Sequence, residues 1–147
     1  MKYLEDFVVG EVEKVGEHHL TQEEIIEYAK KWDPQFFHTD PETAGKSIFR
    51  GLVAAGTHLL AITVFHLVTH QPKVAVLAAI GWDEVRFHGP ARPGDILTIF
   101  RECIESRQSA TRRDRGVVRN RLALSNQKGE SVLSFVDTIL VSKGPSA

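Results

Sequence analysis

The sequence predicts an α+β fold in which one curved antiparallel sheet wraps around a long central helix. The stretch from Leu52 to Val68 is apolar on nearly every face, which is typical of a helix that other elements surround. From Lys73 onward the pattern changes to strand-like segments joined by short turns, which favours an antiparallel sheet. A sheet that curls around the helix would bury the apolar surface of both, and this is the hot-dog arrangement.

The first expected elements are an irregular strand and a helix. Short apolar pieces broken by Gly10 and Gly16 predict an irregular strand region in residues 7–20. Thr21 and Glu24 form a Ser/Thr-x-x-Glu capping box, in which side chains satisfy the free N–H groups at the start of a helix. We therefore expect a helix to begin at Thr21.

This helix is expected to end near Trp32. Asp33 precedes Pro34, and the residue before a proline is pushed out of the α region. The segment from there to Pro41 is expected to be a loop rather than a helix. A short overhanging helix should follow, because Asp40 is a good N-cap and Pro41 fits the first helical position.

Four or five strands are predicted after the long helix. Prolines and a glycine in residues 90–95 indicate a turn, and residues 126–130 carry a hairpin signal. The strand-like segments are residues 74–82, 82–89, 96–105, 117–127 and 131–142. Since the sequence has no repeat or linker, we expect residues 1–147 to form a single domain.

Length, charge and cysteine content exclude several classes of protein. The chain has 147 residues and a formal net charge of −1, so nothing overall indicates nucleic acid or an anionic membrane as a partner. The single cysteine, Cys103, rules out an intrachain disulfide and predicts a reducing compartment, the cytoplasm. The start of the chain shows no signal peptide, and Leu52–Val68 falls short of the ~20 apolar residues of a membrane span.

The strongest candidates for chemistry are Asp33 and His38, which flank the proline-broken loop. A carboxylate near an imidazole is the usual acid/base pair, because histidine titrates near neutrality and the carboxylate orients it. Phe36 and Phe37 between them would limit the access of water. The alternative is that Asp33 caps a turn and His38 is a packed loop residue, and spacing alone leaves both interpretations open.

Gly56 lies where the long helix is expected to start. Its N–H group could be approached closely by a ligand oxygen, and helix-start donors favour negative charge. A carbonyl oxygen that becomes an oxyanion would be stabilised there. The alternative is that Gly56 only permits close packing of the helix against the sheet.

Other polar residues give weaker indications. His66 and His70 share a helix face, but without a third ligand no metal site is predicted. His18 and His19 suggest no geometry, and Cys103 is expected to lie in the core. A group of arginines could contact phosphates or simply form a solvated sheet face. These are Arg107, Arg112, Arg113, Arg115, Arg119 and Arg121.

Taken together, the segments resemble the MaoC-like family, which includes the (R)-specific enoyl-CoA hydratases. The segment EDFVVGEV resembles the opening strand of the family, and VRFHGPARPGDIL resembles its strand–turn–strand element. Residues 21–56 resemble the hydratase segment of the family, and their sequence is TQEEIIEYAKKWDPQFFHTDPETAGKSIFRGLVAAG. In that segment of the family, a helix ends at a catalytic Asp, a catalytic His follows five residues later, and a glycine leads into the hot-dog helix.

The resemblance implies a lyase of acyl-CoA (fatty acid) metabolism that hydrates a trans-2-enoyl-CoA to a 3-hydroxyacyl-CoA, and the reverse. Asp33 and His38 would activate one water, and the Gly56 N–H would bind the thioester oxygen. The acyl chain would run along the buried helix. Coenzyme A, or an acyl carrier, would be part of the substrate, with no further cofactor. A homodimer, or a higher oligomer of dimers, is implied, with coenzyme A along the subunit boundary.

The sequence departs from the family pattern at several positions. Family hydratases carry Asp-x-Asn-Pro-x-His, whereas residues 33–38 are DPQFFH, which keeps the spacing but not the Asn-Pro. The residue before the glycine is Ala55 instead of the frequent His, and a supporting serine falls at Val64. Two alternatives therefore stay open, namely a hot-dog acyl-CoA thioesterase and a non-catalytic subunit that binds acyl thioesters.

Overall fold

The computed structural model describes residues 1–146 of the chain, and its centre is one antiparallel sheet. Within these residues the sheet has five strands in the spatial order β1-β3-β4-β5-β2. Their bounds are β1 (Val12–His19), β2 (Val76–Phe87), β3 (Ile96–Gln108), β4 (Arg115–Ser125) and β5 (Ser131–Ser142). Only β1 and β2 lie at edges, so β2 pairs with β5 on one side and has no neighbouring strand on the other among the described residues.

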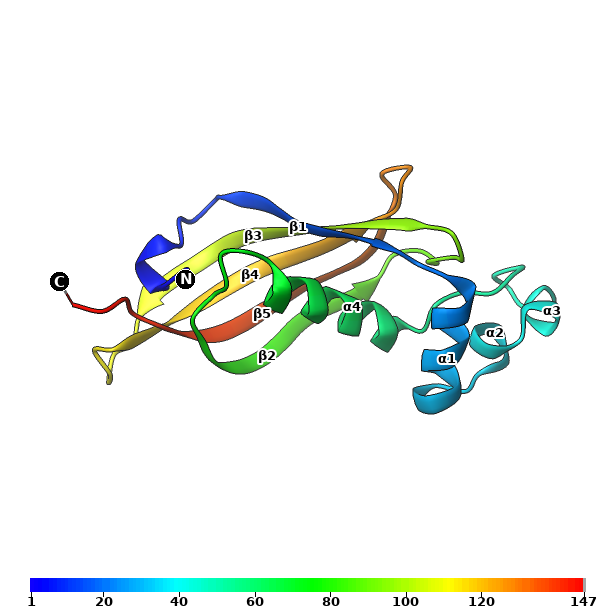
Figure 1. Cartoon of the computed structure of the whole chain (residues 1–147), viewed down its shortest axis with the longest axis horizontal. Coiled ribbons are helices and arrows are strands. Elements are labelled where there is room, and N and C mark those ends of the chain that lie inside the picture. The colour runs from blue at the N-terminus through cyan, green and yellow to red at the C-terminus, as the bar shows by residue number, and fades with distance from the viewer. Residues whose placement is uncertain (147) are drawn as a thin grey trace.

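The helices lie against one face of this sheet and at one end of it. They are the 3-10 helix η1 (Leu4–Asp6) and the α-helices α1 (Gln22–Trp32), α2 (Phe36–Thr39), α3 (Pro41–Ala44) and α4 (Gly56–Thr69). Figure 1 shows α4 running along the concave face, with α1, α2 and α3 gathered beyond its start and both termini at the opposite end. The predicted hot-dog arrangement with an overhanging helical segment is confirmed.

The starts of α1 and α3 follow the local signals of the sequence, although only half of the predicted capping box forms. The Thr21 side chain accepts the Glu24 N–H at 3.2 Å, and Asp40 caps α3 through the Glu42 N–H at 3.0 Å. The other half of the predicted capping box does not form, because the Glu24 carboxylate accepts instead from His18 at 2.6 Å.

Two predicted boundaries are wrong. The segment expected to be a loop contains one helical turn, α2, because Pro34 ends α1 but residues 36–39 hold no proline that would prevent a new turn. The two strand-like segments at 74–82 and 82–89 form the single strand β2. Register shifts and a positive φ of 54° at Glu84 bend this strand without ending it.

The prediction that α4 is surrounded on all sides is only half right within one chain. Its exposed side includes Val64, Phe65 and Val68, with exposed fractions of 38%, 57% and 58%. A sheet packs on one face of a helix, so the opposite face of α4 needs a different cover. The described part of the chain supplies no such cover. The buried residues of α4 are His58, Leu59, Leu60, Ile62 and Thr63.

No helix within residues 1–146 combines the length and the apolar character that crossing a membrane would require.

A row of polar residues divides the core beneath α4. On β3, β4 and β5 the inward-facing residues are apolar except at Arg101, Asn120 and Asp137, which are 4%, 1% and 7% exposed. Glu13 of β1 continues this series, since it stands opposite Arg101 in the sheet. We call these four residues the polar row. One apolar cluster, which includes Ile99, lies on one side of it, and a smaller cluster on the other side includes Cys103.

The Glu13 carboxylate is the most heavily paired member of the polar row. Arg101 donates to it at 2.7 Å, His70 Nε2 lies 2.7 Å from it, and Lys2 Nζ lies 3.5 Å away. Burial alone would raise the pKa of Glu13, but the hydrogen bonds from Arg101 and His70 outweigh it and lower the pKa to about 2. Ionised Glu13 therefore holds β1, β3 and the end of α4 together.

The variant Glu13→Gln should lose stability in a pH-dependent way. The folded pKa of about 2 lies below the ordinary 4.5, so the contribution of ionised Glu13 is fully present above pH 4.5 and is lost as pH falls toward 2. We expect a loss in the free energy of unfolding of about 1–3 kcal/mol at neutral pH that shrinks below pH 4.5. Urea unfolding at a series of pH values measures it. Glu17→Gln, exposed on the same strand, is the control, and a difference independent of pH would contradict the assignment.

Candidate active site

A cleft of ≈ 550 Å³ lies at the start of α4. Asp33 enters it from the end of α1, His38 from α2, Gly56 from the first residue of α4, and Phe87 and His88 from the end of β2. The structure therefore brings together the three residues that the sequence singles out, Asp33, His38 and Gly56. The overhang formed by α1–α3 in Figure 1 is the element that carries two of them to the helix start.

Asp33 is fixed by the end of the helix that precedes it. Its N–H donates to the Ala29 carbonyl at 2.8 Å, as the C-cap of α1. Pro34 then turns the chain away from the helix axis. The Gln35 side chain donates to Asp33 Oδ1 at 3.0 Å, which leaves Oδ2 to face His38. Gln35 thus restrains the carboxylate from its own loop.

His38 is buried, 6% exposed, and its tautomer follows from its contacts. Its Nδ1 lies 2.7 Å from the Val53 carbonyl oxygen, which can only accept, so Nδ1 carries the proton. In the neutral ring Nε2 is then an acceptor. The Val53 N–H in turn donates to the Phe37 carbonyl at 3.0 Å, so α2 is tied to the segment that leads into α4.

The arrangement places two hydrogen-bond acceptors opposite each other. His38 Nε2 and Asp33 Oδ2 are 3.5 Å apart. When the His38 ring is neutral and Asp33 is ionised, both atoms are acceptors and neither has a proton to give the other. A water molecule has two O–H donors and can donate one to each acceptor. Such a water would be oriented by both groups and could lose a proton to either one. The pair is therefore suited to activating a water as a nucleophile.

Both interpretations of Gly56 are compatible with its surroundings. As the first residue of α4 it has no intrahelical acceptor for its N–H, which lies in the wall of the cleft. A Cβ at this position would lie 2.5 Å from the ring of Phe87, so the absence of a side chain also permits close packing of β2. The packing role can be seen directly, and the donor role remains a prediction.

His88 is a cleft residue that sequence reasoning missed. Its Nε2 lies 2.6 Å from the Ser134 hydroxyl oxygen, which ties the end of β2 to β5 at the rim of the cleft. The only available signal was that His88 falls in the strand–turn–strand segment 85–97. Nothing in its immediate neighbours distinguishes it from a surface histidine.

A second group of ionisable residues lies beside the cleft, between α1 and α4. Glu24 Oε1 lies 2.6 Å from His18 Nε2 and 3.2 Å from His58 Nε2, and His66 Nε2 lies 3.1 Å from His18 Nδ1. Tyr28 stacks on the His58 ring with centroids 4.5 Å apart. Burial lowers the pKa of His58, although the Glu24 charge offsets part of this shift. The group joins β1, α1 and α4 behind the site.

His66 and His70 do not converge on a common point. His66 contacts His18, whereas His70 Nε2 lies 2.7 Å from the Glu13 carboxylate at the other end of the sheet face. Among residues 1–146, no set of three or more His, Cys, Asp or Glu side chains is arranged to hold a metal ion.

The arginines of β3, β4 and the turn between them do not line the cleft. Several pair with carboxylates of the same strands or turn, as expected for a solvated face. The pairs are Arg107–Glu105 at 2.9 Å, Arg119–Glu105 at 3.4 Å, Arg121–Glu102 at 3.4 Å and Arg115–Asp114 at 2.8 Å. Val64, where the family serine was expected, also lies outside the cleft and lines a second cavity farther along α4.

Comparison with known proteins places this chain in a family. Residues 7–125 match the family model described as MaoC like domain. The chain is 33% identical to a MaoC-like dehydratase from Rhodospirillum rubrum, with a TM-score of 0.87 over 98% of this chain and 99% of that structure.

Two further proteins are similar over most of their length. An uncharacterized protein of Bacillus subtilis, YdeM, is 28% identical over 142 residues, which cover 95% of this chain and 99% of that protein. The (R)-hydratase PhaJ1 of Pseudomonas aeruginosa, in its unliganded form, shares the fold at 21% identity and a TM-score of 0.80, over 97% of this chain and 87% of that one. Because the family model covers residues 7–125, most of the chain, the protein belongs to the MaoC-like domain family.

Proposed function

We propose that the protein is a hydratase/dehydratase that adds water to a trans-2-enoyl-CoA and forms a 3-hydroxyacyl-CoA, and that it also catalyses the reverse. One observation carries the proposal: Asp33 Oδ2 and His38 Nε2 face each other at 3.5 Å in a cleft beside the start of α4. The names of the similar proteins, a dehydratase and an (R)-hydratase, support the same reaction class.

In the proposed reaction Asp33 and His38 hold one water by its two protons. The water oxygen attacks C3 of the enoyl group as one of the two residues takes a proton. The π electrons of the double bond move toward the thioester, whose oxygen gains enolate charge beside the Gly56 N–H. The proton taken from the water is then delivered to C2, and the 3-hydroxyacyl product leaves. The chemistry uses water and the thioester alone, so we propose no resident cofactor, with coenzyme A as part of the substrate.

Asp33→Asn and His38→Gln should each abolish most hydration and leave the fold intact. A general acid or base is commonly worth ~10²–10⁴-fold in rate, and we expect losses in this range. Loss of ultraviolet absorbance of the conjugated enoyl thioester measures turnover, over a panel of enoyl-CoAs of increasing length. Thermal unfolding followed by circular dichroism checks the fold.

The matched controls are Asp114→Asn and His19→Gln, which change exposed residues outside the cleft and outside β2. Near-normal turnover of both site variants on the best substrate would rule out the dyad. A thiol-trapping dye in the same assay detects release of free coenzyme A, which would favour the thioesterase alternative. Binding without either reaction would favour a non-catalytic subunit.

The donor role of Gly56 can be separated from its packing role. Proline is well tolerated at the first position of a helix, where the N–H that it lacks has no acceptor within the helix. Ala55 already has the extended backbone conformation that the residue before a proline requires. Since any Cβ would meet the Phe87 ring, the substitution belongs in a Phe87→Ala background. There, Gly56→Pro should lower turnover by about 10²–10³-fold, the usual cost of removing one oxyanion donor.

Gly56→Ala in the same Phe87→Ala background is the control, because it adds the Cβ and keeps the N–H. We expect it to retain the turnover of Phe87→Ala alone. If the alanine and proline variants lose turnover equally, Gly56 serves packing and not oxyanion binding.

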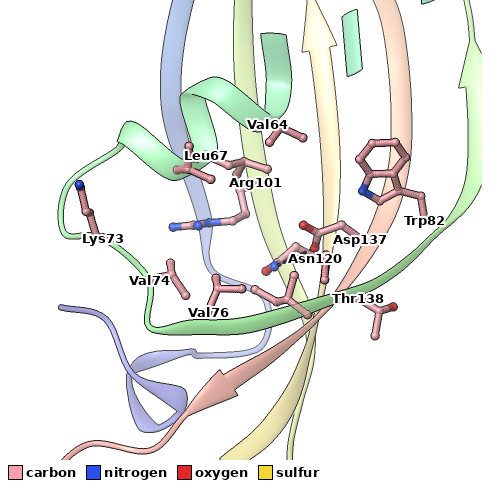
Figure 2. A pocket seen from close by; sticks show the side chains of 13 residues that line it. Val64, Leu67, Lys73, Val74, Val76, Trp82, Arg101, Asn120, Asp137 and Thr138 are labelled. Carbon is pink, nitrogen blue, oxygen red and sulfur yellow. Dashed lines mark hydrogen bonds between the residues drawn. The ribbon is translucent and has the colours of Figure 1, made fainter. Parts of the chain in front are cut away.

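We also propose that the protein is a homodimer of the cytoplasm, joined through β2 and α4. Strand β2 is an edge strand, and an exposed edge is open to pairing with another chain. Its large apolar side chains include Ile80 and Trp82, which are 58% and 48% exposed, and Trp82 lines the same cavity as Val64 and Val68 of α4 (Figure 2). A second copy related by a two-fold axis would cover both surfaces at once.

Ile80→Lys should weaken this dimer, because a charge would have to be buried or unpaired at the joined edges. Light scattering behind a sizing column should show a dimer for the native chain and a concentration-dependent monomer for the variant. Val9→Lys, an equally exposed apolar position away from β2, should remain a dimer. A native chain that is monomeric and fully active would overturn the shared interface.

A further inference from the structure

The segment between α3 and α4 passes the cleft without forming a helix or a strand, and a side chain from another element holds it. Arg92, in the turn between β2 and β3, donates from Nη2 to the Phe49 carbonyl oxygen at 2.6 Å. Its guanidinium also lies against Gly51, where a Cβ would come within 3.2 Å of Nη1. Phe49 lines the cleft, whereas Arg92 does not. Arg92 therefore supports the wall of the site from outside.

The backbone of Arg92 is fixed within its own turn. Its N–H donates to Asp95 Oδ2 at 2.8 Å, and the Asp95 N–H donates back to the Arg92 carbonyl at 3.0 Å. Gln127, from the turn between β4 and β5, donates to Asp95 Oδ1 at 3.1 Å. The Arg92 side chain thus starts from a rigid base on the sheet, and its contact with Phe49 ties the segment to that sheet.

The charge of Arg92 is used on a neutral group. Among residues 1–146 its guanidinium has no ion-pair partner, and the hydrogen bond that it donates goes to the Phe49 carbonyl. Hydrogen bonds from an ionised donor are shorter and stronger than those between neutral groups. A strong bond to a main-chain carbonyl fixes the course of the backbone, whereas an ion pair would fix only another side chain. The placement of Arg92 is therefore suited to holding the segment in one conformation.

The segment contains a strained residue that needs such support. Arg50 has a φ of 57°, in the left-handed region that residues other than glycine rarely adopt. A residue of this kind persists only where the surrounding structure holds it. Arg92 binds the Phe49 carbonyl directly before it, and the Ala91 carbonyl accepts from the Ala54 N–H at 2.9 Å after it. The turn between β2 and β3 therefore holds the strained backbone from both sides.

This segment contacts α2 at two points. The Phe49 ring packs against Phe37 with centroids 5.4 Å apart, and the Phe37 ring stands edge to face with His38 at 4.5 Å. The Val53 carbonyl accepts from His38 Nδ1 at 2.7 Å, and the Val53 N–H donates to the Phe37 carbonyl at 3.0 Å. The conformation of the segment therefore sets where the His38 ring lies and which of its nitrogens carries the proton.

We propose that Arg92 is a positioning residue for the Asp33/His38 pair, and that it acts by holding this segment against α2. Without the hydrogen bond to Phe49 the strained backbone relaxes, and the Val53 carbonyl moves away from His38 Nδ1. The ring then loses the contact that fixes its tautomer, and Nε2 no longer faces Asp33 as an acceptor. The inference rests on the proposed function only for the reaction that the pair performs, because the state of the ring can be observed without any reaction.

Nuclear magnetic resonance of histidine-labelled protein tests the state of the ring. Correlations between ring protons and ring nitrogens distinguish the two neutral tautomers, and a spectrum of His38→Gln identifies the His38 signals. At a pH where the ring is neutral, we expect native His38 to carry its proton on Nδ1 alone. Arg92→Met cannot donate a hydrogen bond, so we expect signals of both tautomers. The control is Arg113→Met, at an exposed arginine between β3 and β4, which should keep the native tautomer.

The same variants should differ in turnover of the best enoyl-CoA. A misplacement of about 1 Å can cost about 10²-fold in rate, so Arg92→Met should lower kcat by about 10–100-fold with little change in KM. Loss of a residue that only bound substrate would instead raise KM. Arg92→Lys keeps a charged donor and should recover most of the turnover and the single tautomer. Arg92→Gln, too short to reach Phe49, takes the place of the methionine variant if that variant does not fold.

Thermal unfolding of each variant separates positioning from general stability. A variant that unfolds at a lower temperature but keeps the native tautomer and native kcat would overturn the inference. Hydration by the native protein that Arg92→Met leaves unchanged would keep the proposed function and also overturn the inference. If the native protein hydrates no enoyl-CoA, the proposed function fails, whereas mixed tautomers in Arg92→Met would still support the positioning of His38 by Arg92.

Discussion

The structure depends on one constraint, which is that α4 is apolar on nearly all sides and a single sheet can cover only one of them. The sheet curves around the inner face, where Leu59, Ile62 and Thr63 are buried. Each of the two aliphatic side chains, Leu59 and Ile62, contributes roughly 1.5–3 kcal/mol when it is removed from water, so this face fixes where α4 lies. The outer face of α4 and the edge strand β2 both keep exposed apolar side chains, and surfaces of this kind mark sites of association with other molecules.

The position of α4 in turn decides where chemistry can occur. Its first turn has free N–H groups, and the overhang of α1–α3, which lies beyond that end in Figure 1, brings Asp33 and His38 to it. The overhang is held there by two means. The His38 ring and the backbone of Phe37 are both hydrogen-bonded to Val53, and Glu24 joins α1 to α4 through His58. The acid/base pair is therefore positioned by the same contacts that anchor the overhang.

The parts of this structure that could be predicted are those with local causes. Thr21, the Asp33–Pro34 step and Asp40 each act on neighbouring backbone, so the ends of α1 and α3 follow from the sequence alone. That Asp33 and His38 lie together was also accessible, because both residues lie within one short segment. Their catalytic role is what the family resemblance implies, and it stays a prediction.

The parts that could not be predicted depend on contacts between distant segments. The Glu24 side chain is placed to complete the capping box of α1, but it contacts the His18 ring of β1 instead. No local signal in the sequence indicates this contact. The Arg101–Glu13 pair joins residues 88 positions apart, and it exists only because β1 and β3 pair in one particular register. A shift of β1 by one residue in that register would turn Glu13 to the other face, away from Arg101. The bulges that merge residues 76–87 into one strand are likewise set by pairing with β5.

The polar row shows most clearly that stability alone did not shape the interior. Ile99, Arg101 and Cys103 face the same side of β3, and the middle one interrupts what would be a continuous apolar core. Replacing buried ionic groups by apolar residues of similar volume is often neutral or stabilising, so their presence gains little for folding by itself. Glu13 and Arg101 satisfy each other, and Asn120 donates to Asp137 at 3.2 Å. Glu13 stands opposite Arg101 and Asn120 opposite Asp137, so each pair favours one alignment of two neighbouring strands, and the row then specifies the register of the sheet at the cost of a divided core.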